Sequence, residues 1–143
     1  MSGLPACSRS FGAAWRDDGN AAVEFALISP VLLTFLLGIV CYGGYFWLAH
    51  NVQQLANDAA RAAVGGLTAS ERLKLAQDCL KEEIIDYDAL NPAFATVRYA
   101  EHADSFTVSV VYDASGSVFF ALAFLPMPSS SIRRSGTVRL GGF

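Results

Sequence analysis

The sequence predicts an α+β protein with a long N-terminal helix, a second amphipathic helix and a small antiparallel sheet of about three strands. Three observations predict this fold. No Asp, Glu, Lys, Arg or His occurs from residue 25 to residue 49. Apolar residues then recur at helical spacing up to about residue 87, and further along the chain the period changes to two.

The uncharged run Phe25–Ala49 predicts a single membrane span. Hydrophobic residues make up 53% of the 143 residues, and this run accounts for the excess over an ordinary soluble domain. As a helix rising about 1.5 Å per residue it would measure roughly 37 Å, enough to cross a hydrocarbon core of about 30 Å. Membrane lipid is therefore an expected partner.

A polar and partly charged leader, residues 1–19, precedes this run. A cleaved secretory signal has an apolar region of about 7 to 15 residues, which is far shorter than the run seen here. Arg9 and Arg16 come before the span, and the first basic residue after it is Arg61. Because basic residues favour the cytoplasmic side, this order predicts a cytoplasmic leader and an exported C-terminal domain.

The boundary between leader and span carries a specific pattern. Residues 19–30 read GNAAVEFALISP, with one carboxylate at the mouth of the apolar stretch. This pattern resembles the processing site of type IV-like prepilins, in which a membrane-embedded aspartic peptidase cuts after a glycine. The cut leaves a glutamate as the fifth residue of the mature chain. Counted from Asn20, Glu24 is the fifth residue and Phe25 the sixth.

A second segment extends the resemblance. The run AVEFAL at residues 22–27, Pro30, and the run NDAARAA at residues 57–63 are together similar to TadE-like pseudopilins of the tight-adherence (Flp) pilus system. The resemblance covers residues 15–64. It implies a leader at residues 1–19 cleaved between Gly19 and Asn20, a membrane-spanning helix and stem at residues 20–66, and a periplasmic domain at residues 67–143.

The resemblance also implies a location, a role and partners. The chain would span the bacterial inner membrane once and act in the biogenesis or initiation of a tight-adherence pilus. Its partners would be a prepilin peptidase, another pseudopilin and a pilus assembly platform. The alternative is an uncleaved single-span protein whose periplasmic domain binds a ligand or partner. An exported enzyme is a distant third hypothesis.

Glu24 has two interpretations. A carboxylate driven to the bilayer centre costs about 2.5–3.5 kcal/mol, so the side chain could simply reach back to the interface. The resemblance implies instead that Glu24, with Phe25 beside it, sets the axial register by pairing with the new N-terminal ammonium of Asn20 on a neighbouring subunit. Pro30 lacks an N–H, so we expect a kink or a short unwinding at residues 28–32.

The helical pattern continues beyond the span. Leu48, Val52, Leu55, Ala59 and Ala62 recur at spacings of three and four, which predicts an uninterrupted stem ending at a Gly65–Gly66 cap. The run TASE at residues 68–71 is typical of a capping box, and an apolar stripe predicts a second helix over residues 70–88. Its acidic residues Glu82, Glu83 and Asp86 are typical of a solvated face rather than of a catalytic pair.

Alternation with a period of two predicts three strands in the last third of the chain. They cover residues 96–99, 106–112 and 132–140, and a turn at residues 102–104 joins the first two as a hairpin. The apolar run at residues 118–125 is too short to span a membrane.

This run could form a buried strand, a core helix or an exposed loop. We favour helical or irregular structure packed on the sheet or stem. Contact of Phe119, Phe120 and Phe124 with a partner or the bilayer is a further hypothesis.

No motif for catalysis is present. The sequence lacks HExxH, CxxC, a glycine-rich phosphate loop and GxSxG. Its net charge of −3 is not gathered into a basic patch, so nucleic acid is not an expected partner. The three cysteines lie in three different predicted regions, which argues against a disulfide framework. We expect no enzyme, no catalytic, metal or cofactor site and no small-molecule substrate.

Overall fold

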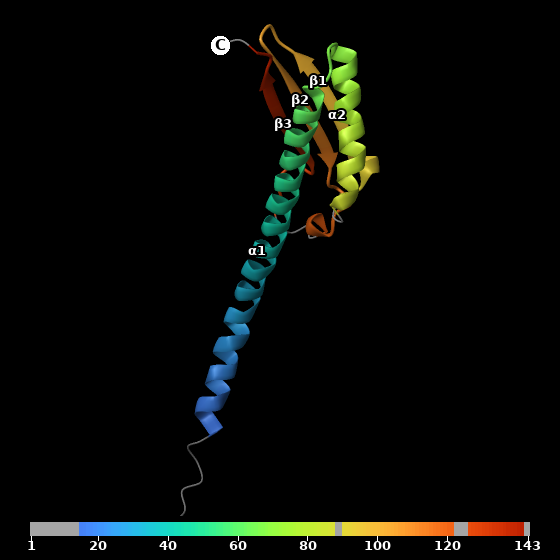
Figure 1. Cartoon of the computed structure of the whole chain (residues 1–143). Helices are drawn as coiled ribbons and strands as arrows, with labels where there is room; N and C mark the ends of the chain where they lie inside the picture. The colour runs from blue at the N-terminus through green and yellow to red at the C-terminus, as the bar shows by residue number, and fades with distance from the viewer. Residues whose placement is uncertain (1–14, 88–89, 122–125, 142–143) are drawn as a thin grey trace, which may run out of the picture. The chain divides into compact units, whose positions relative to one another are not determined.

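The computed structural model describes residues 15–87, 90–121 and 126–141, and the side chains from residue 19 onward. The chain divides into two compact units, residues 1–38 and 39–143. Its helices are α1 (Trp15–Ala63) and α2 (Ala69–Glu83), and its strands are β1 (Ala95–Glu101), β2 (Ser105–Asp113) and β3 (Ser131–Arg139) (Figure 1). Short 3₁₀ helices lie at Ile84–Asp86, Pro92–Phe94 and Val118–Phe120. The predicted α+β fold class is confirmed.

The first unit contains the N-terminal part of α1, and almost every side chain in it from residue 19 is exposed. Its exposed apolar residues include Phe25, Leu27 and Phe35. A helix that buries none of these side chains in protein needs an apolar surrounding such as lipid. By length and composition α1 can cross a membrane once, which is consistent with a single-pass membrane protein.

The helix is continuous through Pro30, so the short unwinding expected at residues 28–32 is wrong. The proline ring removes one N–H and leaves a carbonyl one turn earlier without its usual partner. The Thr34 hydroxyl donates a hydrogen bond to the Pro30 carbonyl at 2.8 Å, and both flanking turns keep their helical assignment. The kink predicted at Pro30 stays a prediction.

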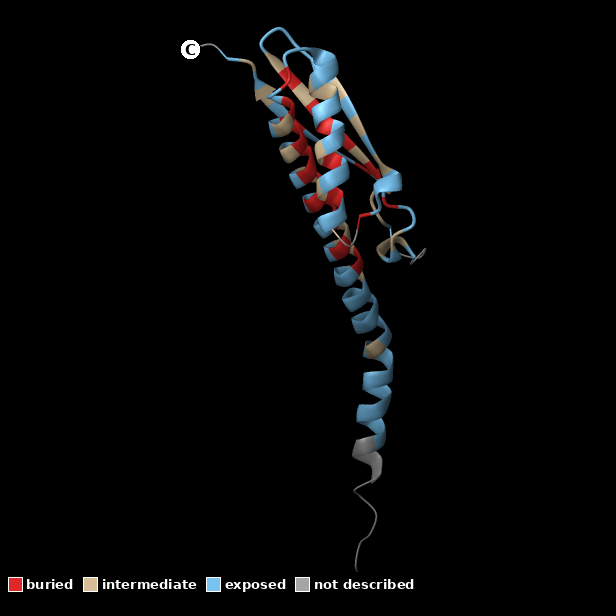
Figure 2. Cartoon of the chain, turned by 45° about the vertical axis from the view of Figure 1, so that its right-hand side comes forward, coloured by how far each residue is buried: buried red, intermediate tan, exposed pale blue. Residues whose placement is uncertain are grey.

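The stem of α1, residues 39–63, belongs to the second unit and is continuous with the span, as predicted. Figure 2 shows its buried residues on the side turned toward the sheet and α2. Leu48, Val52, Leu55 and Ala59 are buried as predicted, whereas Ala62 is only half-buried. Asn51, a polar residue outside the predicted apolar stripe, is also buried. The buried face is therefore wider than the predicted stripe.

The start of α2 follows the predicted capping box. The Thr68 hydroxyl accepts from the Glu71 N–H, and the Glu71 carboxylate accepts from the N–H groups of Thr68 and Leu67. These bonds satisfy amide donors that a helix N-terminus otherwise leaves free. The helix ends at Glu83, earlier than predicted. A 3₁₀ helix then continues to Asp86, and Asp88 lies outside the described residues.

The sheet is an antiparallel meander in the order β1–β2–β3. Val110 of β2 pairs with Val97 of β1 and Arg134 of β3, so the predicted hairpin at residues 102–104 is present. Alternate residues of β2 are fully buried and the others face away from the helices. Helices α1 and α2 cover one face of the sheet and leave the other face open (Figures 1 and 2).

Two hydrophobic clusters join the helices to this sheet. The larger contains Leu48, Leu55, Leu80, Val110 and Ile132, and the smaller contains Ala60, Ala76 and Phe106 with their neighbours. Full burial of each large side chain contributes about 1.5–3 kcal/mol. The stem of α1 is thus part of the folded core of residues 39–143.

Candidate assembly site

The expected cleavage site lies in the first turns of α1. Gly19 and Asn20 are helical and exposed, as is Glu24 one turn further on. The Asn20 side-chain amide donates to a Glu24 carboxylate oxygen at 3.2 Å. The two positions are four residues apart and therefore lie on one helix face. Asn20, which would become the new N-terminus, thus lies next to Glu24 within one chain.

Phe25 and Pro30, the other expected assembly residues, are exposed on the same helix. Phe25 shows 68% of its surface, and together with Val23, Leu27 and Ile28 it makes most of the surface of this part of α1 apolar, apart from the face that carries Asn20 and Glu24. Such a helix can contact lipid or another apolar helix with most of its surface.

Two phenylalanines from the apolar run pack on the stem. Phe119 lies directly over Gly44, where an added methyl group would overlap the ring. Phe120 meets Tyr45 edge to face, with ring centroids 6.1 Å apart. The Tyr42 hydroxyl donates to the Pro126 carbonyl of the same connection. Residues 118–120 therefore form a 3₁₀ helix packed on the stem, which matches the favoured expectation.

The phenylalanines expected to contact a partner or the bilayer are therefore less exposed than the sequence predicted. Phe119 and Phe120 are half-buried, and Phe124 lies outside the described residues. The exposed apolar side chains at this level of the stem are Val118, Phe46 and Trp47, which expose 78%, 64% and 50% of their surfaces. Aromatic residues at the end of a span are enriched at membrane interfaces.

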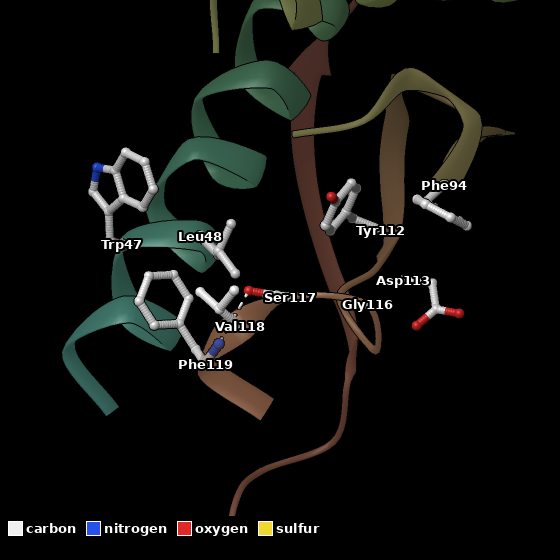
Figure 3. A pocket seen from close by; sticks show the side chains of 9 residues that line it. All are labelled: Trp47, Leu48, Phe94, Tyr112, Asp113, Gly116, Ser117, Val118 and Phe119. Carbon is white, nitrogen blue, oxygen red and sulfur yellow. Dashed lines mark hydrogen bonds between the residues drawn. The ribbon is translucent and has the colours of Figure 1, made fainter. Parts of the chain in front are cut away.

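A shallow groove of about 360 Å³ lies beside these residues (Figure 3). Its apolar wall comes from Trp47, Leu48 and Val118, and Asp113 lies at its edge. The Ser117 hydroxyl accepts from the Phe119 N–H and so fixes the start of the 3₁₀ helix. In the described ranges no group of three or more His, Cys, Asp or Glu side chains could hold a metal ion.

Acidic side chains gather along α1 and α2 in the second unit. The pKa of Glu83 is raised, first by burial and then by the negative charge of Asp58 on α1. Burial and the carboxylates of Glu83 and Asp58 raise the pKa of the Cys79 thiol to about 11. This thiol is protonated at neutral pH and is therefore a poor nucleophile.

Arg72 joins three parts of the domain at the opposite end of α2. Its guanidinium donates to the Gly66 carbonyl at 3.0 Å and pairs with Glu101 at 3.1 Å. It also lies over the Phe106 ring, 5.4 Å from the centroid. The Arg72 side chain is 12% exposed and that of Glu101 is 48% exposed, so the arginine is largely shielded from water while its carboxylate partner is not. Together these contacts hold the start of α2 against the sheet.

A comparison with protein families tests the resemblance to TadE-like proteins. Residues 19–61 match the family model described as TadE-like protein. The resemblance is thereby confirmed over this segment, which contains Gly19, Glu24 and most of the stem. The match covers less than half of the 143 residues, so it shows what this part of the chain is similar to. Neither the curated proteins nor the solved structures contain a match.

Sequence reasoning missed three features of the structure. Gly44 lies in the uncharged run, where glycine is common in membrane helices, yet it receives the ring of Phe119. Gly136 and Arg72 received no role, although both hold the sheet against the helices. A glycine inside a strand is itself a signal for close backbone approach, so Gly136 could have been found.

Proposed function

We propose that this chain is a pseudopilin, cleaved between Gly19 and Asn20 by a prepilin peptidase, that acts in the biogenesis or initiation of a tight-adherence pilus. The observation that carries the proposal is the family match. It begins at Gly19, the residue that would end the leader, and it includes Glu24. The matched segment lies entirely on α1, the helix that can cross a membrane.

The peptide bond to be cleaved lies within helical residues. A peptidase needs this backbone to open, and the bond lies early in α1, one turn after the helix begins at Trp15. Glycine in a helix is less favourable than alanine by about 1 kcal/mol. Gly19 therefore weakens the helix at the bond that would be cut.

The role of Glu24 follows from its position beside the new N-terminus. In a single copy the carboxylate accepts from the Asn20 amide. Cleavage would create an ammonium group on Asn20, and a neighbouring subunit could present that group to Glu24. A charged pair in an apolar surrounding strongly favours one axial position, because leaving either partner alone in the bilayer is costly.

The proposed topology follows from the same helix. The leader lies in the cytoplasm, α1 crosses the inner membrane, and residues 67–143 form a periplasmic domain. A second pseudopilin and the assembly platform are the expected protein partners. Val118, together with Phe46 and Trp47, lies at the membrane surface in this arrangement and contacts lipid or a neighbouring span.

The decisive experiment measures the N-terminus and the intact mass of the membrane-extracted protein, in strains with and without the prepilin peptidase. An N-terminus at Asn20 that depends on the peptidase is the expected result. An intact leader in both strains would refute the pseudopilin proposal and favour the uncleaved single-span alternative.

A second experiment separates processing from assembly. Glu24→Gln should leave the mature mass unchanged and strongly reduce the number of pili on the cells. Thr34→Ala is the matched control, because it removes another exposed polar group from the same span. Normal piliation in the Glu24→Gln strain would exclude the register role.

A further inference from the structure

The open face of the sheet is polar and basic. Every second residue of β2 faces away from the helices, and Ser109, at the centre of this row, is itself buried. The Thr107 and Thr137 hydroxyls of adjacent strands lie 2.9 Å apart on this face. Three arginines from β1 and β3 share the face with these hydroxyl groups. We name it the basic sheet face, and its charged residues are Arg98, Arg133 and Arg139.

These arginines are exposed, and no carboxylate among the described residues lies within ion-pair distance of them. The ion pairs within 4.0 Å in the described residues use Arg61, Arg72 and Lys81. The acidic residue on the basic sheet face is Asp113, at the last position of β2, and its carboxylate accepts from the Ser115 N–H. The middle of the face therefore carries unneutralised positive charge.

The opposite charge gathers on the helices, which cover the other side of the sheet. Glu82 and Glu83 end α2, and Asp86 follows one turn later in the adjoining 3₁₀ helix, so these three carboxylates lie close together. Asp58 of α1 is near enough to Glu83 to affect its charge. We name these four residues the acidic helix surface. Arg61 approaches Asp58 only to 3.9 Å and is 81% exposed. This pair does not offset the four carboxylates, because exposed ion pairs are weak.

The single span restricts how two copies can meet. All copies enter the membrane in the same direction, so their stems run parallel. Two basic sheet faces placed against each other would bring arginines onto arginines, which is repulsive. A basic sheet face against an acidic helix surface pairs opposite charges and keeps the stems parallel. Such a contact uses two different surfaces, so it leaves one of each free and can continue to a third copy.

We propose that the basic sheet face of one copy docks on the acidic helix surface of a second copy of this chain. The contact orders copies front to back beside the membrane. It goes beyond the proposed function, because neither surface includes the leader, and it can form whether or not the leader is cleaved. Its charged character predicts that raised salt weakens it.

Cross-linking of the full chain in its own membrane tests this contact. Two copies with different tags are co-expressed in a background in which all three native cysteines are replaced. One carries Ser135→Cys on the basic sheet face, and the other carries Ala62→Cys on α1, one turn after Asp58. A bismaleimide should link the two tags, while a strain with Ser135→Cys alone should give no linked dimer. The pair is measured with and without the prepilin peptidase, so failed processing and a failed contact are told apart.

Charge reversal tests the reason for the contact. Arg98→Glu with Arg133→Glu in the first copy should reduce the mixed product about tenfold, by repulsion across the interface. Adding Glu82→Arg and Glu83→Arg to the second copy should restore it, which also shows that the first variant is folded. Lys74→Glu, on another part of α2, is the control and should leave the yield unchanged.

Three results would overturn the proposal. The first is a product between two Ser135→Cys copies in place of the mixed one. The second is a mixed product that is unaffected by the charge reversals. The third is capture of a different membrane protein by Ser135→Cys without any mixed product, which would assign the basic sheet face to another partner.

Discussion

Gly136 of β3 lies directly against the backbone of Ala56 in the stem of α1. A methyl group on Gly136 would come within 2.8 Å of the Ala56 carbonyl oxygen and 2.9 Å of the Ala60 methyl. Contact with a backbone atom cannot be relieved by rotating a side chain. The strand and the stem are therefore as close as a glycine allows, and this closeness holds the sheet to α1, the helix that is long and apolar enough to cross a membrane.

Gly136→Ala should therefore destabilise the domain. Overpacking of this kind costs about 1–3 kcal/mol in the free energy of unfolding, although alanine otherwise suits a strand better than glycine. Urea unfolding of the detergent-solubilised full chain measures the difference. Gly116→Ala is the control, because its methyl would meet nothing within 4 Å. Equal stability of the two variants would contradict the close approach.

Most of the fold could be predicted because its signals are local. The alternation in β2 and β3, the capping box at Thr68 and the uninterrupted stem all depend on residues close together in the chain. Period two shows that Gly136 shares a face with Ile132, but it does not show which element covers that face. A contact between distant segments, such as Gly136 with Ala56, produces no periodic pattern in the sequence.

The same distinction applies to the candidate site. Asn20 and Glu24 are four residues apart on one helix, so their proximity follows from the sequence. Phe119 and Gly44 are far apart along the chain, and nothing local connects them. The apolar run could therefore be identified as needing cover, while the glycine that receives it could not.

The contact of the Phe119 ring with Gly44 gives a second prediction. Gly44→Ala should push the ring out of place and expose the connection at residues 118–121, because the added methyl overlaps the ring. Chymotrypsin should then cut after Phe119 or Phe120 faster than in the parent chain. Gly43→Ala is the neighbouring control, since nothing lies within 4 Å of its added methyl.

A double mutant checks the cause of that effect. In Phe119→Ala the ring is absent, so adding Gly44→Ala should produce little further change in the free energy of unfolding. Two residues in direct contact show such non-additivity, whereas independent sites add. If the effects of Gly44→Ala and Phe119→Ala are fully additive, then Gly44→Ala acts on α1 itself and not through contact with the Phe119 ring.

The ion pairs of Arg72 and Lys81 should differ in their contribution to stability, because Arg72 is mostly buried and Lys81 is exposed. Arg72→Ala removes the bonds to Gly66 and Glu101 and the contact with the Phe106 ring. We expect a loss of about 2 kcal/mol, because these bonds involve a charged group that is mostly shielded from water. Lys81→Ala removes an exposed 3.9 Å pair with Asp78 and should change stability by less than about 0.5 kcal/mol. A comparable loss in both variants would contradict the anchoring role of Arg72.

The pKa values of Glu83 and Glu71 are shifted in opposite directions, which predicts opposite effects of pH on their contributions to stability. Hydrogen bonds from the backbone N–H groups of Thr68 and Leu67 lower the pKa of Glu71. Its stabilising contribution is present above the pKa of an unfolded glutamate and is lost as the pH falls through its own lowered pKa. Glu71→Gln should therefore weaken the fold at neutral pH, and the difference should disappear in acid.

For Glu83, burial and the charge of Asp58 raise the pKa in the folded state. The folded chain then holds this proton more tightly than the unfolded chain, so the contribution of Glu83 is fully present below the unfolded pKa and is lost as the pH rises through the raised one. Glu83→Gln should therefore stabilise the protein at pH 7 and leave it unchanged near pH 3, where both side chains are neutral. Melting temperatures of the parent and the two variants across this range measure the effect. Destabilisation by Glu83→Gln at neutral pH would show that the carboxylate of Glu83 is held by a favourable partner rather than opposed by Asp58.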